Sequence, residues 1–113
     1  MEYSVINLKE DLPTVELALA NLEIHLELMK KAGGKVVKVI HGYGSHGVGG
    51  AICNAVRKYL FQEKRKRNIK DVILGDEWDI SSSKTQSVLK MCPDASTDED
   101  LNHRNTGITV IVL

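Results

Sequence analysis

The stretch of the sequence best suited to chemistry is a glycine-rich segment at residues 41–50. It reads His-Gly-Tyr-Gly-Ser-His-Gly-Val-Gly-Gly, so five of its ten residues are glycine. Glycine permits turns with positive φ and lets a ligand approach the backbone closely. A helix that begins directly after such a loop offers unpaired N–H groups to an anion. The pattern predicts a site for a phosphate-bearing ligand, with His41 as its side-chain contact. A plain strand-to-helix connection would explain the same glycines, and both interpretations stand at this point.

The elements on either side of this segment would position it. Residues 36–40 are almost all apolar, which predicts a strand buried on both faces. A helix is expected from about Gly49 or Gly50 to Lys66. Its core face would consist of Ile52, Ala55, Val56, Tyr59 and Leu60. The opposite face would carry Asn54, Arg57, Phe61, Lys64 and Arg65, with Lys58 nearby. Basic residues at a helix C-terminus are expected from the helix dipole; the alternative is a ridge that contacts phosphates.

The remaining chain predicts an α/β fold. Strands are expected at residues 3–8, 69–74 and 108–113, and a short helix at 83–91. Thr14 is a suitable N-cap for a long helix that would end at the Gly33-Gly34 pair. The order is β-α-β-α-β-insertion-β. It predicts one domain over residues 1–113, a two-layer sandwich with a four-stranded, mostly parallel mixed sheet and two main helices. Residues 76–104 would form an ordered insertion before the last strand.

The long helix has two apolar lines. One is the core stripe, which comprises Val15, Ala18, Leu19, Leu22, Leu26 and Met29. The other is an outer line of Leu17, Ile24 and Leu28, which also needs a cover. The insertion, with Trp78, Val88 and Leu89 as apolar anchors, is the favoured cover, and a second copy of the chain is the alternative. His25, beside the core stripe, is interpreted as structural or solvated.

Composition sets further bounds. The 113 residues carry 15 basic and 15 acidic side chains, so the net charge is zero. That balance argues against indiscriminate coating of nucleic acid but permits a local basic face. Cys53 and Cys92 fit small buried apolar residues in a reducing compartment. Without a signal-peptide pattern or an apolar run of ~18 residues, the sequence predicts a soluble cytoplasmic chain with no membrane partner.

Several features together resemble the small MutS-related (Smr) domain family. They are the strand and His-Gly-x-Gly loop at residues 36–60, the Leu-Pro-Thr-Val-Glu opening of the long helix, and the Gly-Ile-Thr-Val strand that begins at Gly107. The resemblance covers residues 4–74 and 105–113. It implies nucleic-acid binding, with DNA nicking or RNA cutting in some members. It also implies a sandwich similar to the C-terminal domain of a translation initiation factor.

The sequence departs from that family at one motif. The family's first strand usually reads Leu-Asp-x-His, and the matching positions here are Ile6-Asn7-Leu8-Lys9. An amide cannot act as a carboxylate base, and a lysine is normally protonated near neutral pH. The resemblance therefore predicts DNA or RNA binding with weak or lost nuclease activity. The expected binding residues are His41, Gly42, Tyr43, Gly44, Ser45, His46, Gly47, Gly49, Gly50, Lys9, Arg57, Lys58, Lys64 and Arg65.

Two alternatives stay open. In the first, the domain is an active endonuclease, with His41 or His46 as the acid or base and Lys9 stabilising the phosphate charge. Asp11 could then substitute for the missing carboxylate if the loop brings it back to the site. Only in this case is Mg²⁺ or Mn²⁺ expected, with carboxylates drawn from Asp76, Glu77 and Asp79; otherwise no cofactor or metal is predicted. In the second, the domain binds a protein or a small phosphorylated ligand, with a possible homodimer through Leu17, Ile24 and Leu28.

Overall fold

The computed structural model describes residues 2–10, 13–42 and 48–113, and it contains the predicted elements in the predicted order. The α/β fold class is thereby confirmed. The strands and helices are β1 (Tyr3–Asn7), α1 (Val15–Lys31), β2 (Val36–Ile40), α2 (Val48–Arg65), β3 (Asp71–Leu74), α3 (Ser83–Met91) and β4 (Ile108–Val112). Two short 3₁₀ helices, η1 (Gly75–Glu77) and η2 (Pro93–Thr97), flank α3. The Thr14 hydroxyl accepts a hydrogen bond from the Leu17 N–H and caps α1 as expected.

The four strands form one mixed sheet in the order β1-β2-β4-β3. β1 pairs with β2 in parallel, and β4 is antiparallel to both β2 and β3. β1, β2 and β3 therefore run in the same direction. The expectation that successive strand–helix–strand units pair in parallel is met only by β1 and β2. β3 does not pair with β2, because the fully buried β4 lies between them and takes a central position.

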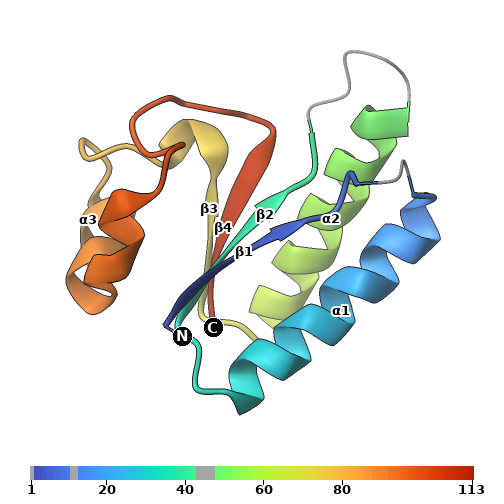
Figure 1. Cartoon of the computed structure of the whole chain (residues 1–113), viewed down its shortest axis with the longest axis horizontal. Helices are drawn as coiled ribbons and strands as arrows, with labels where there is room; N and C mark the ends of the chain where they lie inside the picture. The colour runs from blue at the N-terminus through green and yellow to red at the C-terminus, as the bar shows by residue number, and fades with distance from the viewer. Residues whose placement is uncertain (1, 11–12, 43–47) are drawn as a thin grey trace.

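α1 and α2 cover one face of the sheet (Figure 1). The core on this side is built from Ala18, Leu22 and Leu26 of α1, several residues of α2, and the residues of β2, β3 and β4 that point to this face. Phe61 was expected on the outer, basic face of α2, and that was wrong. Its ring packs against the same core, because residue 61 lies far enough round the helix towards the sheet to bury part of an aromatic side chain.

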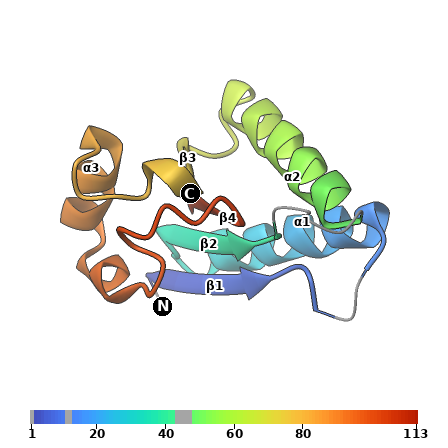
Figure 2. The same cartoon turned by 90° about the horizontal axis from the view of Figure 1, so that it is seen from above.

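The segment from η1 to the start of β4 covers the opposite face of the sheet. Figures 1 and 2 both show α3 across the sheet from α1 and α2. Trp78, Val88 and Cys92 pack there against Val36 and Ile73. The segment contains α3 and η2, and it does not cover the outer line of α1. Leu17, Ile24 and Leu28 are 53%, 59% and 61% exposed. The bare sheet face offered the segment a larger apolar surface than a single helix stripe could.

A buried ion cluster fixes this segment to the sheet. Lys38 of β2 is 1% exposed. Its ammonium lies 2.7 Å from Asp98 Oδ1 and 2.6 Å from Asp100 Oδ2. Tyr3 and Trp78 also donate hydrogen bonds to Asp98. Burial alone would lower the pKa of Lys38, but the hydrogen bonds to the two carboxylates outweigh it and raise that pKa. The cluster joins β1, β2 and the far segment through paired charges.

The substitution Lys38→Ala tests this cluster. It leaves two carboxylates near the core without their cation, so we expect a loss of about 3–5 kcal/mol in the free energy of unfolding. Urea denaturation followed by circular dichroism measures it. Lys35→Ala is the matched control, because the Lys35–Glu2 pair at 3.2 Å has side chains that are 44% and 47% exposed. We expect less than about 1 kcal/mol there. Equal losses in both variants would contradict the structural role of the cluster.

Candidate functional site

The parallel pairing of β1 and β2 brings their carboxyl ends together. Asn7 lies opposite Ile40 in the register, and the Leu8 N–H donates to the Ile40 carbonyl at 2.8 Å. Lys9 and Gly42 are therefore neighbours. A Cβ atom placed on Gly42 would lie 3.8 Å from Lys9 Cδ. Gly42 has φ = +74°, a conformation that favours glycine. The structure thus brings together Lys9 and the start of the glycine-rich segment, as predicted.

His41 is fully buried at this edge, and both nitrogens of its ring are engaged. Nδ1 lies 2.6 Å from the Gly42 carbonyl, and Nε2 lies 2.8 Å from the Thr109 hydroxyl. A carbonyl only accepts, so Nδ1 carries the proton and the hydroxyl donates to Nε2. Burial lowers the pKa of His41, and the nearby charge of Arg57 lowers it further against the opposing bond to Gly42. The ring is therefore a neutral bridge from β2 to β4.

Arg57 supplies a second positive charge beside this bridge. Its Nη2 donates to the Thr106 carbonyl at 3.0 Å, which fixes the guanidinium against the turn before β4. The backbone N–H groups of His41 and Gly42 both donate to the Gly107 carbonyl, each at 3.0 Å. Within the described residues, the buried Nε of Arg57 has no hydrogen-bond partner. Lys9 and Arg57 thus place two positive charges near Gly42 and His41, where the imidazole ring itself is neutral.

The other predicted binding residues lie in three places. Tyr43, Gly44, Ser45, His46 and Gly47 are outside the described residues. Gly49 and Gly50 belong to the first turn of α2, and Lys58 is exposed further along this helix. Lys64 and Arg65 are in its last turn, about 24 Å from its first residue at 1.5 Å per residue. Lys64 also pairs with Asp71 at 2.9 Å.

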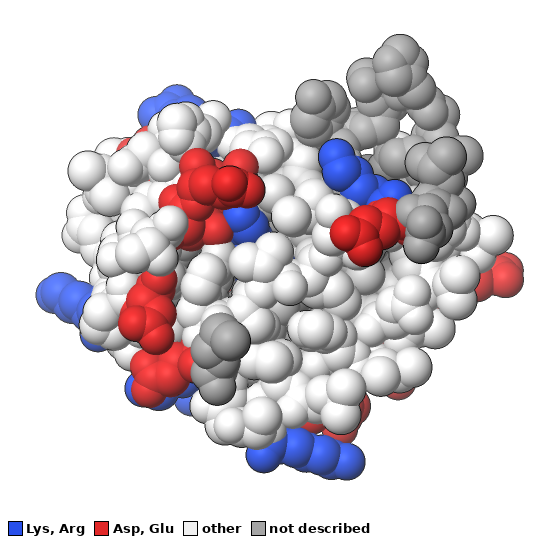
Figure 3. Space-filling model, in the orientation of Figure 1, with Lys and Arg blue, Asp and Glu red and all other residues white. Residues whose placement is uncertain are grey.

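The surface charge is local on the visible face. In Figure 3 the few Lys and Arg side chains stand apart, and Asp and Glu gather over the half of the molecule that holds α3. A strong basic field over that whole face is thereby excluded. The positive charge relevant to the site comes from individual residues, and Lys9 and Arg57 are the pair that flanks His41 and Gly42.

Carboxylates are sparse at this edge. The last residue of β1 is Asn7, an amide and not a carboxylate, and its Oδ1 accepts the Lys9 N–H at 3.0 Å. β3 ends at the same edge, but β4 separates it from β2. Asp79 is engaged locally, since it accepts from the Ser81 N–H at 2.9 Å and the Ser81 hydroxyl at 2.8 Å. Asp11 lies outside the described residues. Across residues 2–10, 13–42 and 48–113, no group of three or more His, Cys, Asp or Glu could hold a metal ion.

The sequence did not identify the partners that hold the site. Thr109 and the carbonyls of Thr106 and Gly107 position His41 and Arg57. Thr109 follows a strand pattern in which every residue is buried, so a polar residue there needs a buried partner. That polar residue in an apolar strand was the available signal, although nothing in the sequence specified His41 as the partner.

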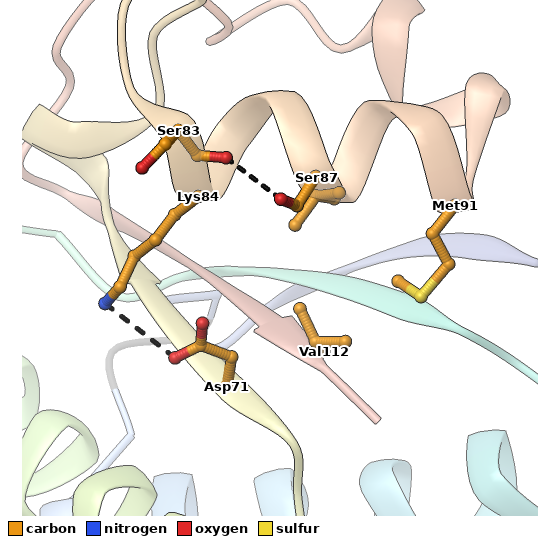
Figure 4. Close-up of a pocket in the computed structure, with 7 residues that line it drawn as sticks. Asp71, Ser83, Lys84, Ser87, Met91 and Val112 are labelled. Carbon is orange, nitrogen blue, oxygen red and sulfur yellow. Dashed lines mark hydrogen bonds and ion pairs between the residues drawn. The ribbon is translucent and has the colours of Figure 1, made fainter.

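Among the surface hollows in the described part of the molecule, two lie on opposite faces of the sheet. The first, of about 310 Å³, lies between the end of β1 and α1. The second, of about 270 Å³, lies between β3, β4 and α3 (Figure 4). In the second, Lys84 Nζ is 3.7 Å from Asp71 Oδ1, and the Ser87 hydroxyl donates to the Ser83 carbonyl at 3.1 Å. These polar groups largely satisfy one another, and the hollow is separate from Lys9 and His41.

Together, the fold and the site define a small α/β domain with a glycine-rich segment at the carboxyl edge of its sheet and two cations beside it. The Smr domain family model matches residues 10–77, which is more than half of the chain. The chain belongs to the Smr domain family. A crystal structure of the Smr domain of Thermus thermophilus MutS2 superposes with a TM-score of 0.60 and 20% identity, over 97% of this chain and 96% of that one. That match shows a shared fold.

Comparison with curated proteins gave no match. In the described part of the chain, no helix combines the length and the apolar composition needed to cross a membrane. Both cysteines are buried free thiols, as expected from the sequence.

The lowered pKa of His41 gives a testable pH dependence. The ring should stay neutral as the pH falls through its ordinary value of 6.5. Because the folded pKa is depressed, His41 stabilises the fold fully above that pH, and this stability is lost as the pH falls towards the folded pKa. Nitrogen-15 NMR of the imidazole should show the Nδ1–H tautomer and a depressed pKa. His41→Gln should remove the stability loss in that pH window. Ordinary titration near 6.5 would contradict the buried, engaged ring.

Proposed function

We propose that this domain binds DNA or RNA through the edge of the sheet at Lys9, His41, Gly42 and Arg57, and that it has weak or no nuclease activity. Smr domains commonly bind nucleic acid, and some members are nucleases. The observation that carries the proposal for this chain is the position of two cations, with Lys9 beside Gly42 and Arg57 near His41. Cations so placed neutralise phosphates without reading the base sequence.

The backbone supports the same ligand class. Gly42 has no side chain, so a phosphate can approach the chain next to Lys9. The α2 helix begins at Val48, within the glycine-rich segment, and favours an anion at that end. Lys58, Lys64 and Arg65 extend along α2 and add contacts to a longer strand of nucleic acid, although Lys64 must then share its charge with Asp71.

Weak chemistry is proposed from Asn7 and His41. The amide oxygen of Asn7 holds the turn to Lys9, and an amide cannot take a proton as a carboxylate does. The lone pair on His41 Nε2 already accepts a hydrogen bond from the Thr109 hydroxyl. A general base needs that lone pair directed at the substrate proton. We therefore propose that His41 supports the binding edge. The competing proposal, an endonuclease with His41 or His46 as acid or base and Lys9 on the phosphate, remains the alternative to test.

Binding is tested with Lys9→Ala. We expect weaker binding, and a slope of log K against log salt that is reduced by about 0.7 on single strands or about 0.9 on B-DNA, the loss of one phosphate contact. Fluorescence anisotropy with labelled oligonucleotides at several salt concentrations measures both quantities. Lys31→Ala is the matched control, since this exposed lysine lies at the C-terminal end of α1, away from the edge. Equal slopes for the wild type and Lys9→Ala would overturn the assignment of Lys9.

The same protein is assayed for cleavage of supercoiled plasmid and structured RNA, with and without Mg²⁺ or Mn²⁺. We expect binding without cleavage. Cleavage that survives purification and disappears in His41→Ala, in a variant that still binds, would replace the proposal with the endonuclease. Absence of both binding and cleavage would leave the protein-interaction or small phosphoryl-ligand alternative.

The two free, buried thiols fit a reducing compartment, and we propose a cytoplasmic location.

A second candidate role is self-association through α1. Leu17, Ile24 and Leu28 lie along one exposed line of this helix. In an antiparallel pair of α1 helices centred on their midpoints, Glu16 of one copy faces Lys30 of the other. A parallel pair would instead oppose like charges.

Light scattering at increasing concentration tests the dimer. A dimer predicts a doubled mass that is lost in Ile24→Glu and kept in Glu23→Gln, an exposed neighbour outside the apolar line. A monomer at all concentrations would exclude this role.

A further inference from the structure

The groove between β1 and α1 lies next to the proposed phosphate edge. Its polar lining consists of Asn7, Asn21 and His25, and its volume is about 310 Å³. Asn7 is the last residue of β1 and lies two residues before Lys9, so their Cα atoms are at most about 7 Å apart across the turn. That spacing is on the scale of one nucleotide. A ligand whose phosphate contacts Lys9 would therefore have its next chemical group over this groove.

The lining of the groove combines amide, imidazole and aliphatic groups. Leu8 is buried and forms part of the wall, whereas Ile24 and Leu28 of α1 are exposed. Asn21, Ile24 and Leu28 recur at helical spacing and so share one side of α1. Within the described residues, the side chains of Asn21 and His25 make no hydrogen bond. The groove thus offers unused donors and acceptors beside apolar surface that solvent now covers.

This combination suits a nucleobase better than a phosphate or a peptide side chain. A base has flat faces that gain from apolar contact and an edge of donors and acceptors that an Asn can pair. Among the described residues that line the groove, there is no lysine or arginine to attract an anion. A paired base inside a duplex presents neither its face nor its pairing edge, so only an unpaired base can enter.

We propose that the groove of Asn7, Asn21 and His25 is a subsite for an unpaired base of the nucleic acid whose adjacent phosphate is held at Lys9 and Gly42. This inference rests on the proposed function and adds a preference for single-stranded or looped nucleic acid over duplex. Asn7 contributes its amide NH₂, because its oxygen is engaged by the Lys9 N–H. Asn21 contributes a complete amide, and His25 contributes a ring that can contact the base face or edge.

The experiment compares two probes of equal length on the full chain. One is a fluorescent adenine 12-mer; the other is a 12-mer of abasic tetrahydrofuran units, which keeps the phosphates and lacks the bases. The test variant is Asn21→Ala combined with His25→Ala, and the control is Glu23→Gln on the same helix. We expect the test variant to lose about five- to twentyfold in affinity for the adenine probe, in line with the loss of base-edge contacts. Its affinity for the abasic probe and its salt slope should stay unchanged.

The outcomes separate the subsite from the function on which it rests. Unchanged affinity for the abasic probe also shows that the variant is folded. If Lys9→Ala weakens both probes but the groove variant weakens neither, the subsite is wrong and the binding function stands. If Lys9→Ala affects neither probe, the proposed function itself fails. Equal wild-type affinity for the two probes, or for the adenine strand before and after pairing with its complement, would overturn the subsite. Adenine binding that declines as light scattering detects dimers would mean that a second copy covers the groove.

Discussion

The position of one buried charge determines much of this structure. Lys38 lies on the central strand β2, and its ammonium cannot stay in the interior without carboxylates. Asp98 and Asp100 provide them, so the segment after β3 must return across the sheet face opposite α1 and α2. Gly75 permits this return, because a Cβ there would lie 1.7 Å from the Asn105 carbonyl oxygen. The far segment is therefore unavailable to α1, and the outer side of that helix stays open to a ligand or a partner.

At the carboxyl edge of the sheet, one residue holds the backbone in place and two other residues carry the positive charge. His41 is neutral and buried, and it connects Gly42 to Thr109 through its two nitrogens. Lys9 and Arg57 carry the positive charge beside it. The neutral ring and the two cations are compatible, because a protonated His41 would repel the charge of Arg57 and lose the hydrogen bond from Thr109. The hydrogen bond from Thr109 that holds the ring also occupies the lone pair of Nε2, so the ring is a poor proton acceptor for a substrate, which supports the proposed binding without cleavage.

The sequence predicted local structure well, and it predicted contacts between distant segments poorly. Residues 36–40 and 83–91 were expected with the bounds that the structure shows, since apolar pattern and capping act over a few residues. The parallel pairing of β1 and β2 brings Lys9 close to Gly42, so two of the predicted binding residues are neighbours, and their binding role stays a prediction. The cover of the outer α1 line and the packing of Phe61 were predicted wrongly, because they depend on where other segments bury their surface. The pairing of Lys38 with Asp98 spans sixty residues of sequence and has no local signal.

The amide at Asn7, where the motif of the family usually has an aspartate, has a physical consequence for the groove between β1 and α1. A carboxylate at this position would place a negative charge next to the phosphate edge and would offer only acceptors. The amide removes that charge, uses its oxygen to hold the turn that presents Lys9, and keeps an NH₂ donor for the proposed base. The substitution that weakens the case for acid–base chemistry therefore strengthens the case for binding. The amide at Asn7 thus agrees with the proposed binding of an unpaired strand, in which the open side of α1 is the proposed second half of the contact.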